Sequence, residues 1–406
     1  MRAGKIVNDP VFGFIKIPGG QLLDIVDHPL MQRLRYIKQL GLASVVYPGA
    51  QHTRFQHSLG AFHLMSEAIH SLSQKGIFIF DSEAEAIMSA ILMHDIGHGP
   101  YSHVLEHTLT DGVSHEDVSL MMMERVNNEM NGNLTLALKI FRDEYPKRFL
   151  HQLISSQLDM DRLDYLRRDS FFTGVTEGNI GSARIIKMLN VVDDNLVVDS
   201  KGIYSIENYL TSRRLMYWQV YLHKTTVGME KMLVNLLLRA KHLMLSGVEL
   251  FATPSLRYFL TNHVDSTFFT SHEEALTYYS QLDDTDIHCS IKEWVNSKDK
   301  VLSALARNVV SRRPFKVEIY EDPIGEDKIA EMEEQLMSQT GVGREDVKYF
   351  YNVSTIQKDM YDIDDDHITI LYKDGTMKDI AEASEILNVQ LLSKKIKKYY
   401  LCHHRI

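Results

Sequence analysis

Residues 91–103 read ILMHDIGHGPYSH and are the most informative stretch of this 406-residue chain. His94 and Asp95 can both bind one divalent cation if the backbone turns there, and the two glycines and the proline that follow favour a turn. His98 and His103 add two further imidazoles within nine residues of His94. A lone His-Asp pair carries little information, but a cluster this dense predicts a metal or catalytic site.

Apolar residues at helical spacing lead up to this cluster. Ile87, Ile91 and His94 lie three to four residues apart, so they share one helix face and the histidine ends an apolar stripe. A second apolar stripe starts at His57, and a third runs into Asp161. The sequence therefore predicts three helices that each carry a potential ligand near one end, in a mainly α fold.

The pattern changes beyond residue 312. The segments Lys316–Tyr320, Val347–Val353 and His367–Tyr372 are rich in β-forming residues, whereas the preceding part is dominated by long helical patterns. We therefore predict a helical-bundle domain over residues 1–312 and a small α+β lobe over residues 313–406.

The composition limits the classes of function. With 44% hydrophobic and 24% charged residues, the chain resembles ordinary globular proteins, and no apolar run approaches the ~20 residues that span a bilayer. The two cysteines, Cys289 and Cys402, suit a reducing compartment. The net charge of −10 argues against nucleic-acid binding but not against a small anion held by local arginines. We expect a cytoplasmic protein without a membrane or nucleic-acid partner.

Four residues make up the predicted metal site: His57, His94, Asp95 and Asp161. Two imidazoles and two carboxylates suit Mn, Fe, Mg, Zn or Ni better than a metal that prefers thiolates. Four protein ligands on an octahedral ion also leave positions for water and substrate oxygens, which catalysis requires.

These residues carry a resemblance to a known family. The segment RFQHS at 54–58, His94-Asp95 and Asp161 reproduce the ordered H…HD…D pattern of HD-superfamily metal-dependent phosphohydrolases. The segments QRLRYIKQLG at 32–41, DMDRLDY at 159–165 and YLHK at 221–224 further resemble the deoxynucleoside triphosphate triphosphohydrolases that carry SAM and HD domains, and their bacterial relatives. The resemblance covers residues 5–240 well and concerns the catalytic core, since no SAM domain is expected before it.

The resemblance implies hydrolysis of a deoxynucleoside triphosphate at its α-phosphorus, with a deoxynucleoside and triphosphate as products. His115 beside Glu116 is a plausible acid with a carboxylate that orients it, and the resemblance gives His115 a catalytic role. It also places His98 and His103 near the phosphates. Glu106 stands where relatives carry an aspartate.

Further residues are candidates for substrate binding. Arg54 lies three residues before His57, close enough on the helix to reach a phosphate at the same metal, and Tyr165 follows Asp161 by one turn. Asp169, one turn further, could accept a hydrogen bond from a 3′-hydroxyl. The resemblance adds four residues to this set: Gln39, Arg162, Arg213 and Tyr221. For Arg167, Arg168 and Arg214 we expect solvated surface positions instead.

The resemblance also implies an activating nucleotide bound between subunits of a homodimer or homotetramer. A side chain such as Arg35 can read a guanine edge through paired hydrogen bonds. The alternative is a simple charge pair on the helix surface between Asp27 and Arg35 or its neighbours. The residues implied for this second site are Asn8, Asp27, Gln32, Arg35, Lys224, Arg312 and Lys316.

Two other functions remain as alternatives. One is an HD-type phosphomonoesterase or phosphodiesterase that acts on other nucleotides, because the same ligand set serves all of these reactions. The other is a nucleotide sensor or single-strand nucleic-acid binder without catalysis. The complete ligand quartet with His115 argues against the second alternative.

Overall fold

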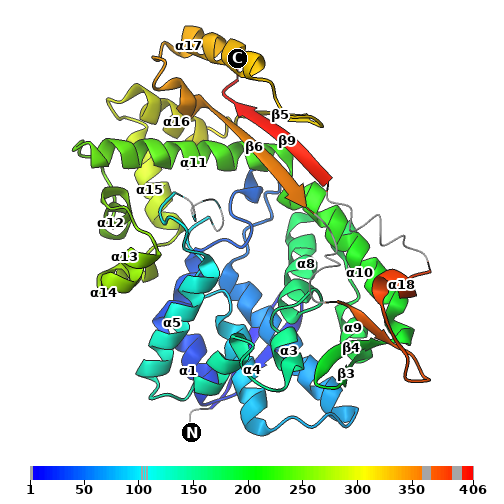
Figure 1. Ribbon diagram of the computed structural model, residues 1–406. Helices are drawn as coiled ribbons and strands as arrows, with labels where there is room; N and C mark the ends of the chain where they lie inside the picture. Colours follow the sequence, from blue (N-terminus) through cyan, green and yellow to red (C-terminus); the bar gives the residue numbers. More distant parts are fainter. Residues whose placement is uncertain are drawn as a thin grey trace.

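The computed structural model describes residues 3–101, 104, 106, 108–358, 367–385 and 396–405. Its architecture is mainly helical with small sheets, which confirms the predicted fold class (Figure 1). The helices of the first half are α1 (Gln21–Asp27), α2 (Pro29–Arg33), α3 (Arg54–Gln74), α4 (Asp81–Met93), α5 (His115–Glu129), α6 (Thr135–Phe141), α7 (Arg148–Gln152), α8 (Met160–Thr173) and α9 (Ser182–Met188). Those of the second half are α10 (Ile203–Met216), α11 (Lys224–Leu245), α12 (Pro254–Thr261), α13 (Ser266–Ser271), α14 (Glu273–Ser280), α15 (Asp284–Trp294), α16 (Lys300–Val310), α17 (Glu326–Thr340) and α18 (Ile380–Ala383).

The three helices predicted to carry ligands pack against one another: α3 contacts both α4 and α8. Helix α3 begins at Arg54 because the Gln56 side chain accepts a hydrogen bond from the backbone amide of Thr53 at 2.9 Å. Gly60 lets α3 and α8 approach closely, since a Cβ there would overlap the side chains of Asp164 and Arg168. The close approach brings the first turn of α3 beside the first turn of α8.

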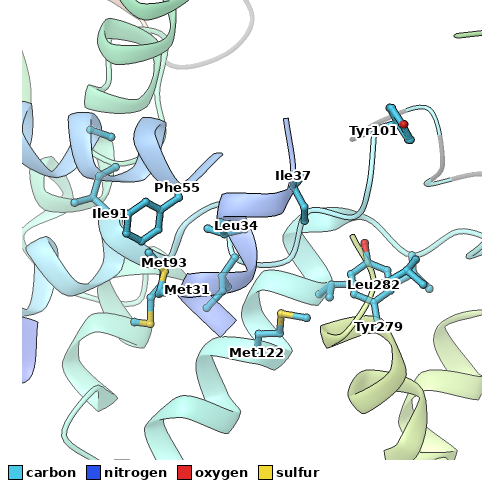
Figure 2. Close-up of a cluster of buried hydrophobic side chains, with 14 of the residues drawn as sticks. Met31, Leu34, Ile37, Phe55, Ile91, Met93, Tyr101, Met122, Tyr279 and Leu282 are labelled. Atoms are coloured by element: carbon cyan, nitrogen blue, oxygen red, sulfur yellow. The ribbon is translucent and has the colours of Figure 1, made fainter. Parts of the chain in front are cut away.

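A buried apolar cluster packs where the start of α3 meets the end of α4. Figure 2 shows Met31 and Leu34 together with Phe55 of α3, and with Ile91 and Met93 at the end of α4. All five side chains are buried. Because interiors of this kind are close-packed, the ends of α3 and α4 have little freedom to move relative to each other. The apolar stripe before His94 thus fixes the position of the ligand that follows it.

Strands form three small sheets. The strands are β1 (Lys5–Asp9), β2 (Gly13–Ile17), β3 (Leu189–Val192), β4 (Asn195–Asp199), β5 (Lys316–Tyr320), β6 (Tyr351–Lys358), β7 (Thr369–Leu371), β8 (Met377–Asp379) and β9 (Ile396–His403). Their orders are β1-β2, β3-β4-β7-β8 and β5-β9-β6. All pairs are antiparallel except β4 with β7, which is parallel.

The part of the chain after residue 312 packs on the helices at two places. The β5-β9-β6 sheet lies over α11 at the top of Figure 1, where Asn235 donates to the backbone oxygens of Tyr349 and Tyr351 at 3.0 and 2.8 Å. Strands β7 and β8 instead extend the β3-β4 hairpin. The division into two domains at residue 312 stays a prediction. Among the described residues, no helix is both long and apolar enough to cross a membrane.

Candidate active site

The His-Asp pair lies directly at the end of α4, and the turn after it is held from several sides. Gly97 is required there because a Cβ would overlap the backbone of His115 and Ser119 in α5. The Ser119 hydroxyl donates to the carbonyl of His94 at 2.9 Å and accepts from the amide of Gly97 at 2.9 Å. Buried Arg33 donates to the carbonyls of Ile96 and His98, at 3.2 and 2.9 Å. Neither Arg33 nor Ser119 was identified from the sequence.

His57, His94 and Asp161 come together as one cluster. The two imidazole Nε2 atoms lie 3.2 Å apart. The Oδ1 atom of Asp161 lies 3.0 Å from Nε2 of His57 and 3.5 Å from Nε2 of His94. One ligand atom from each residue lies within 4.8 Å of the others. The cluster forms where the first turns of α3 and α8 meet the end of α4.

Asp95 borders this cluster from the same turn. One of its carboxylate oxygens lies 3.6 Å from Nε2 of His57 and the other lies 3.5 Å from Nε2 of His94. The guanidinium of Arg54 forms an ion pair with Asp95, and Nδ1 of His98 lies 3.3 Å from its Oδ1. Burial opposes the charge, but His98, Arg54 and His94 hold the pKa of Asp95 well below its usual value.

The Nδ1 atoms of His57 and His94, on the side of each ring away from the cluster, also have hydrogen-bond partners. Nδ1 of His57 lies 2.7 Å from Oδ2 of Asp164, and Nδ1 of His94 lies 2.7 Å from the carbonyl oxygen of Ile91. Each partner accepts a hydrogen bond from Nδ1–H, which leaves Nε2 of both rings free to bind a cation. Metal-binding histidines are oriented in this way.

Asp164 is in turn held by Arg168. The guanidinium donates from Nε and Nη2 to the Asp164 carboxylate at 2.9 Å each, and from Nη1 to Asp9 at 2.8 Å. Arg168 is fully buried, so the expectation of a solvated surface position was wrong. The spacing of four residues between Asp164 and Arg168 could have indicated their contact on one helix face. The sequence could not show that β1 places Asp9 on the other side of Arg168.

The donor set fits a divalent cation. Donor atoms about 2.1 Å from one ion and at right angles to each other lie about 3.0 Å apart, close to the separations in this cluster. Burial opposes protonation of His57, but hydrogen bonds to Asp161 and Asp164 raise its pKa to about 10. Hydrogen bonds from His57 and His94 conversely lower the pKa of Asp161 despite its burial. A cation would take the place of the proton shared between these groups.

A second pair of histidines lies beside Asp95. The rings of His98 and His115 are 4.0 Å apart, and burial together with Arg54 lowers the pKa of His98 to about 3. A hydrogen bond from Nδ1 of His115 to Glu106 instead raises the pKa of His115 against the effect of burial. The environments push the two pKa values in opposite directions, as in an acid paired with a neutral neighbour.

The structure corrects the partner of His115. Glu106 contacts its imidazole and also accepts from its backbone amide, at 3.2 Å, whereas the side chain of Glu116 is exposed. Adjacent residues at the start of a helix point in different directions, so Glu116 could not orient the ring. His103, the other histidine implied near the phosphates, lies outside the described residues.

A cavity of about 570 Å³ opens beside the metal cluster. Of the residues predicted to bind substrate, five line it: Gln39, Arg54, Tyr165, Asp169 and Tyr221. The ring of Tyr165 stands between those of His57 and Tyr221, with ring centres 6.5 and 6.1 Å away. Tyr221 ends a π-helical turn, Tyr217–Tyr221, of a kind common at functional sites.

Asp169 is fixed by two hydrogen bonds. The Tyr221 hydroxyl donates to its Oδ2 at 2.8 Å, and Nε2 of His52 lies 2.7 Å from its Oδ1. His52 is buried, stacks on Phe172 with ring centres 4.5 Å apart, and its Nδ1 has no partner among the described residues. The proton therefore belongs on Nε2, where it donates to Asp169. His52 was missed because no short sequence pattern connects it with Asp169.

Arg162 and Arg213 are near this cavity but are not among the residues that line it. Arg162 donates from Nε to the carbonyl of Ser156 at 2.6 Å and to Asp159 at 3.1 Å. Arg213 is buried, and its Nε and Nη1 atoms have no partner within the described part of the chain. Unsatisfied guanidinium groups are costly to bury, so Arg213 retains donors for an anion.

The residues implied for an activator lie at the surface or are half-buried. Gln32 accepts from Nε of Arg35 at 2.7 Å, and Asp27 pairs with Lys5 at 2.8 Å, so the suggested pair between Asp27 and Arg35 does not form. Asn8, on β1, is exposed. The remaining three residues, Lys224, Arg312 and Lys316, are exposed at the start of α11 and around the start of β5.

Comparisons with known proteins agree with this geometry. A model of the HD domain matches residues 54–169, which contain all four predicted ligands, and a model of the HD-associated region matches residues 180–246. A solved phosphohydrolase of Bacteroides thetaiotaomicron is 66% identical with a TM-score of 0.97, and the alignment covers 99% of this chain and 100% of that one. The chain belongs to the HD-domain phosphohydrolases.

Two further proteins are similar to this phosphohydrolase in sequence. The uncharacterised protein YwfO of Bacillus subtilis is 32% identical over 320 residues, which are 77% of this chain and 71% of YwfO. The human deoxynucleoside triphosphate triphosphohydrolase SAMHD1 is 27% identical over 369 residues, which are 80% of this chain but 56% of SAMHD1. Together with the buried His/Asp cluster, these findings make the chain a metal-dependent HD-domain phosphohydrolase.

Proposed function

We propose that this phosphohydrolase converts deoxynucleoside triphosphates to deoxynucleosides and triphosphate. The observation that carries the proposal is the cavity beside the His57, His94 and Asp161 cluster. It has the ligands for a cation at one side and an aromatic and carboxylate pair at the other. Its volume of about 570 Å³ lies within the usual range of about 300–1,000 Å³ for ligand pockets. The name of the human relative supports the same substrate class.

The phosphates would lie at the metal end. A divalent ion held by His57, His94, Asp95 and Asp161 would supply Lewis-acid stabilisation of the charge on the phosphate. Arg54 lines the cavity and is fixed by Asp95, so its guanidinium is positioned for a phosphate oxygen. Arg213, with its unsatisfied donors, and Arg162 are the further candidates for the outer phosphates.

The sugar would lie against Tyr165 and Tyr221. Each oxygen of Asp169 accepts one hydrogen bond from the protein, which leaves one lone pair per oxygen for a 3′-hydroxyl. The buried Oε1 atom of Gln39 has no partner among the described residues and lines the same cavity. Tyr221 would exclude a 2′-hydroxyl by its bulk, as the resemblance implies.

His115 would serve as the acid. Attack of water at the α-phosphorus breaks the bond to the 5′-oxygen, and the proton held by His115 goes to that oxygen. Glu106 favours the protonated form of His115, because its hydrogen bond to the imidazole raises the pKa of that ring. Neutral His98, packed against the ring, leaves the charge on His115 alone.

The test uses purified protein with Mn²⁺ and each deoxynucleoside triphosphate in turn, with ATP as the ribonucleotide control. Chromatography should find deoxynucleoside and intact triphosphate in equal amounts, and far slower turnover of ATP. Release of orthophosphate or pyrophosphate would show an HD-type phosphatase or phosphodiesterase instead. Binding of the nucleotides without any turnover would indicate a sensor.

We further propose activation by a nucleotide bound between subunits of a homodimer or homotetramer. Size-exclusion chromatography with and without added dGTP or dTTP, run beside the activity assay, tests this. Activity that rises linearly with substrate at low concentration, with no change of assembly state, would contradict it.

A further inference from the structure

The cavity continues beyond the sugar along one face of α11. Thr226, Glu230, Val234 and Leu238 all line it, and they are spaced four residues apart, so they form one stripe on the helix. At a rise of about 1.5 Å per residue, the stripe from the first to the last of these is about 18 Å long. It leads away from Tyr221, which precedes α11. In the proposed function the stripe therefore faces the nucleobase.

Polar groups on this stripe and next to it lack protein partners. Within the described part of the chain, neither Glu230 nor Lys231 makes a hydrogen bond or ion pair, and the buried hydroxyl of Thr226 has no partner. Burial raises the pKa of Glu230 to about 7, and Lys231 only partly opposes this effect. The Thr226 side chain is buried, and Glu230 and Lys231 are half-buried in the same wall. Unpartnered polar groups cost free energy when they are removed from water, so these three are placed for a ligand to complete them.

The rest of this wall is apolar. Val220 and Leu222, just before α11, line the cavity together with Val234 and Leu238. A flat ring can pack between such side chains, while a few polar groups read its edge. The combination of apolar walls, one carboxyl and one ammonium group matches the chemistry of a nucleobase.

We propose that Glu230 reads the base of the substrate and favours guanine. In its ionised form the Glu230 carboxylate only accepts hydrogen bonds, and guanine offers two adjacent donors, N1–H and the N2 amino group, beside the acceptor O6. Lys231 supplies a donor for O6. Adenine and cytosine offer one amino donor next to a ring acceptor, and thymine places its single N–H between two carbonyl oxygens, which repel a carboxylate. This inference rests on the proposed function, which orients the nucleotide in the cavity.

The experiment is a competition in one vessel. Equal concentrations of the four deoxynucleoside triphosphates are incubated with the full-length protein and Mn²⁺, and the rates of consumption are compared. Because every nucleotide is present throughout, any activator acts equally on all four reactions. The wild type should consume dGTP at least about fivefold faster than dTTP, as expected for one well-formed pair of hydrogen bonds.

Two changes isolate the contact. Glu230→Gln replaces one acceptor by a donor and should remove the preference for guanine and move it towards adenine. Glu249→Gln is the matched control, because Glu249 is exposed just beyond the end of α11 and does not line the cavity. Deoxyinosine triphosphate, which lacks the N2 amino group, makes the same comparison on unaltered protein and so does not depend on a variant that folds.

Equal consumption of the four nucleotides by the wild type, or an unchanged ranking in Glu230→Gln, would overturn the proposal. Equal use of dGTP and deoxyinosine triphosphate would overturn it as well. If the ranking behaves as expected but orthophosphate or pyrophosphate is released, the proposed function fails and the reading of the base stands. Should no nucleotide be consumed, calorimetric binding of dGTP and deoxyinosine triphosphate to the same proteins decides the role of Glu230.

Discussion

The two ends of the cavity differ in how their polar groups are satisfied. At the metal end, Nδ1 of His57 and of His94 has a protein acceptor, and Asp95 pairs with Arg54. Along α11, Thr226 and Glu230 have no protein partner in the described part of the chain. The proposed ligands of the cation are fixed by the protein before the substrate arrives, whereas the groups that we propose to read the base are left for it to complete.

The largest effect should follow from loss of a ligand at the metal end. Asp161→Ala removes the carboxylate oxygen that lies 3.0 Å from Nε2 of His57 and 3.5 Å from Nε2 of His94. We expect loss of the bound metal and a fall in turnover of about 10⁴-fold, since the ion stabilises several kcal/mol of charge. Metal analysis of the purified variant, together with its rate, measures both. Full metal content with normal turnover would show that Asp161 is not a ligand of the metal.

His115→Gln should have the next largest effect. It removes the proposed acid but leaves the cluster of His57, His94 and Asp161 untouched, so metal content should stay at the wild-type level. Turnover should fall by about a hundredfold or more, the usual contribution of a general acid, with little change in KM. A variant that loses metal along with activity would place His115 in the scaffold of the site instead.

Asp164→Asn tests whether the fixed end depends on its outer partners. The amide would still meet His57 but could no longer balance buried Arg168, which keeps Asp9 as its other partner. We expect metal affinity to fall by about 10- to 100-fold, as is usual for the partner of a metal-binding histidine. Titration of chelated protein with Mn²⁺ gives the affinity. Wild-type affinity would show that the contact is structural only.

His52→Gln sharpens the comparison at the sugar. The change weakens the hold on Asp169 while Tyr221 still donates to it. KM for a deoxynucleotide should rise by about tenfold, the cost of one lost hydrogen bond to a charged group, with kcat changed less. A 2′,3′-dideoxynucleotide, which has no 3′-hydroxyl, should show a smaller rise. An equal rise for both nucleotides would mean that His52 acts through folding rather than through Asp169.

The smallest effect is a shift in pH dependence. Glu106 raises the pKa of His115, so the protonated acid persists to higher pH and activity is lost only as pH rises through that pKa. Glu106→Gln keeps an acceptor for Nδ1 but removes the charge. The alkaline fall in kcat should therefore move to lower pH, with little change at the acid side. A pH–rate profile measures this, and an unmoved alkaline limb would separate Glu106 from the acid.

The sequence was informative where the chemistry is local. His94 and Asp95 are adjacent, and the apolar stripes before His94 and after His57 point both histidines inward from their helices. Asp161, Tyr165 and Asp169 follow each other at single-turn spacing on α8. This spacing was enough to predict Tyr165 and Asp169 as residues that contact the sugar. The mainly α fold was predicted on the same periodicity and was confirmed.

Contacts across long sequence separations were not accessible in this way. Asp9 and Arg168 are 159 residues apart, and His52 and Asp169 are 117 apart. Neither pair has a spacing that a helix or strand imposes. The choice of Glu106 over Glu116 as the partner of His115 likewise depends on a turn whose direction the sequence does not state.

By itself the sequence determined which residues could bind a cation and on which helix face each of them lies, because backbone periodicity fixes direction within a single element. Only the tertiary structure decided which of these faces meet, which carboxylates support them and which polar groups stay unpaired in the cavity. Those outcomes depend on close packing between elements that are distant in the chain. Gly60 allows α8 to approach α3, and Gly97 allows α5 to approach the turn after His94.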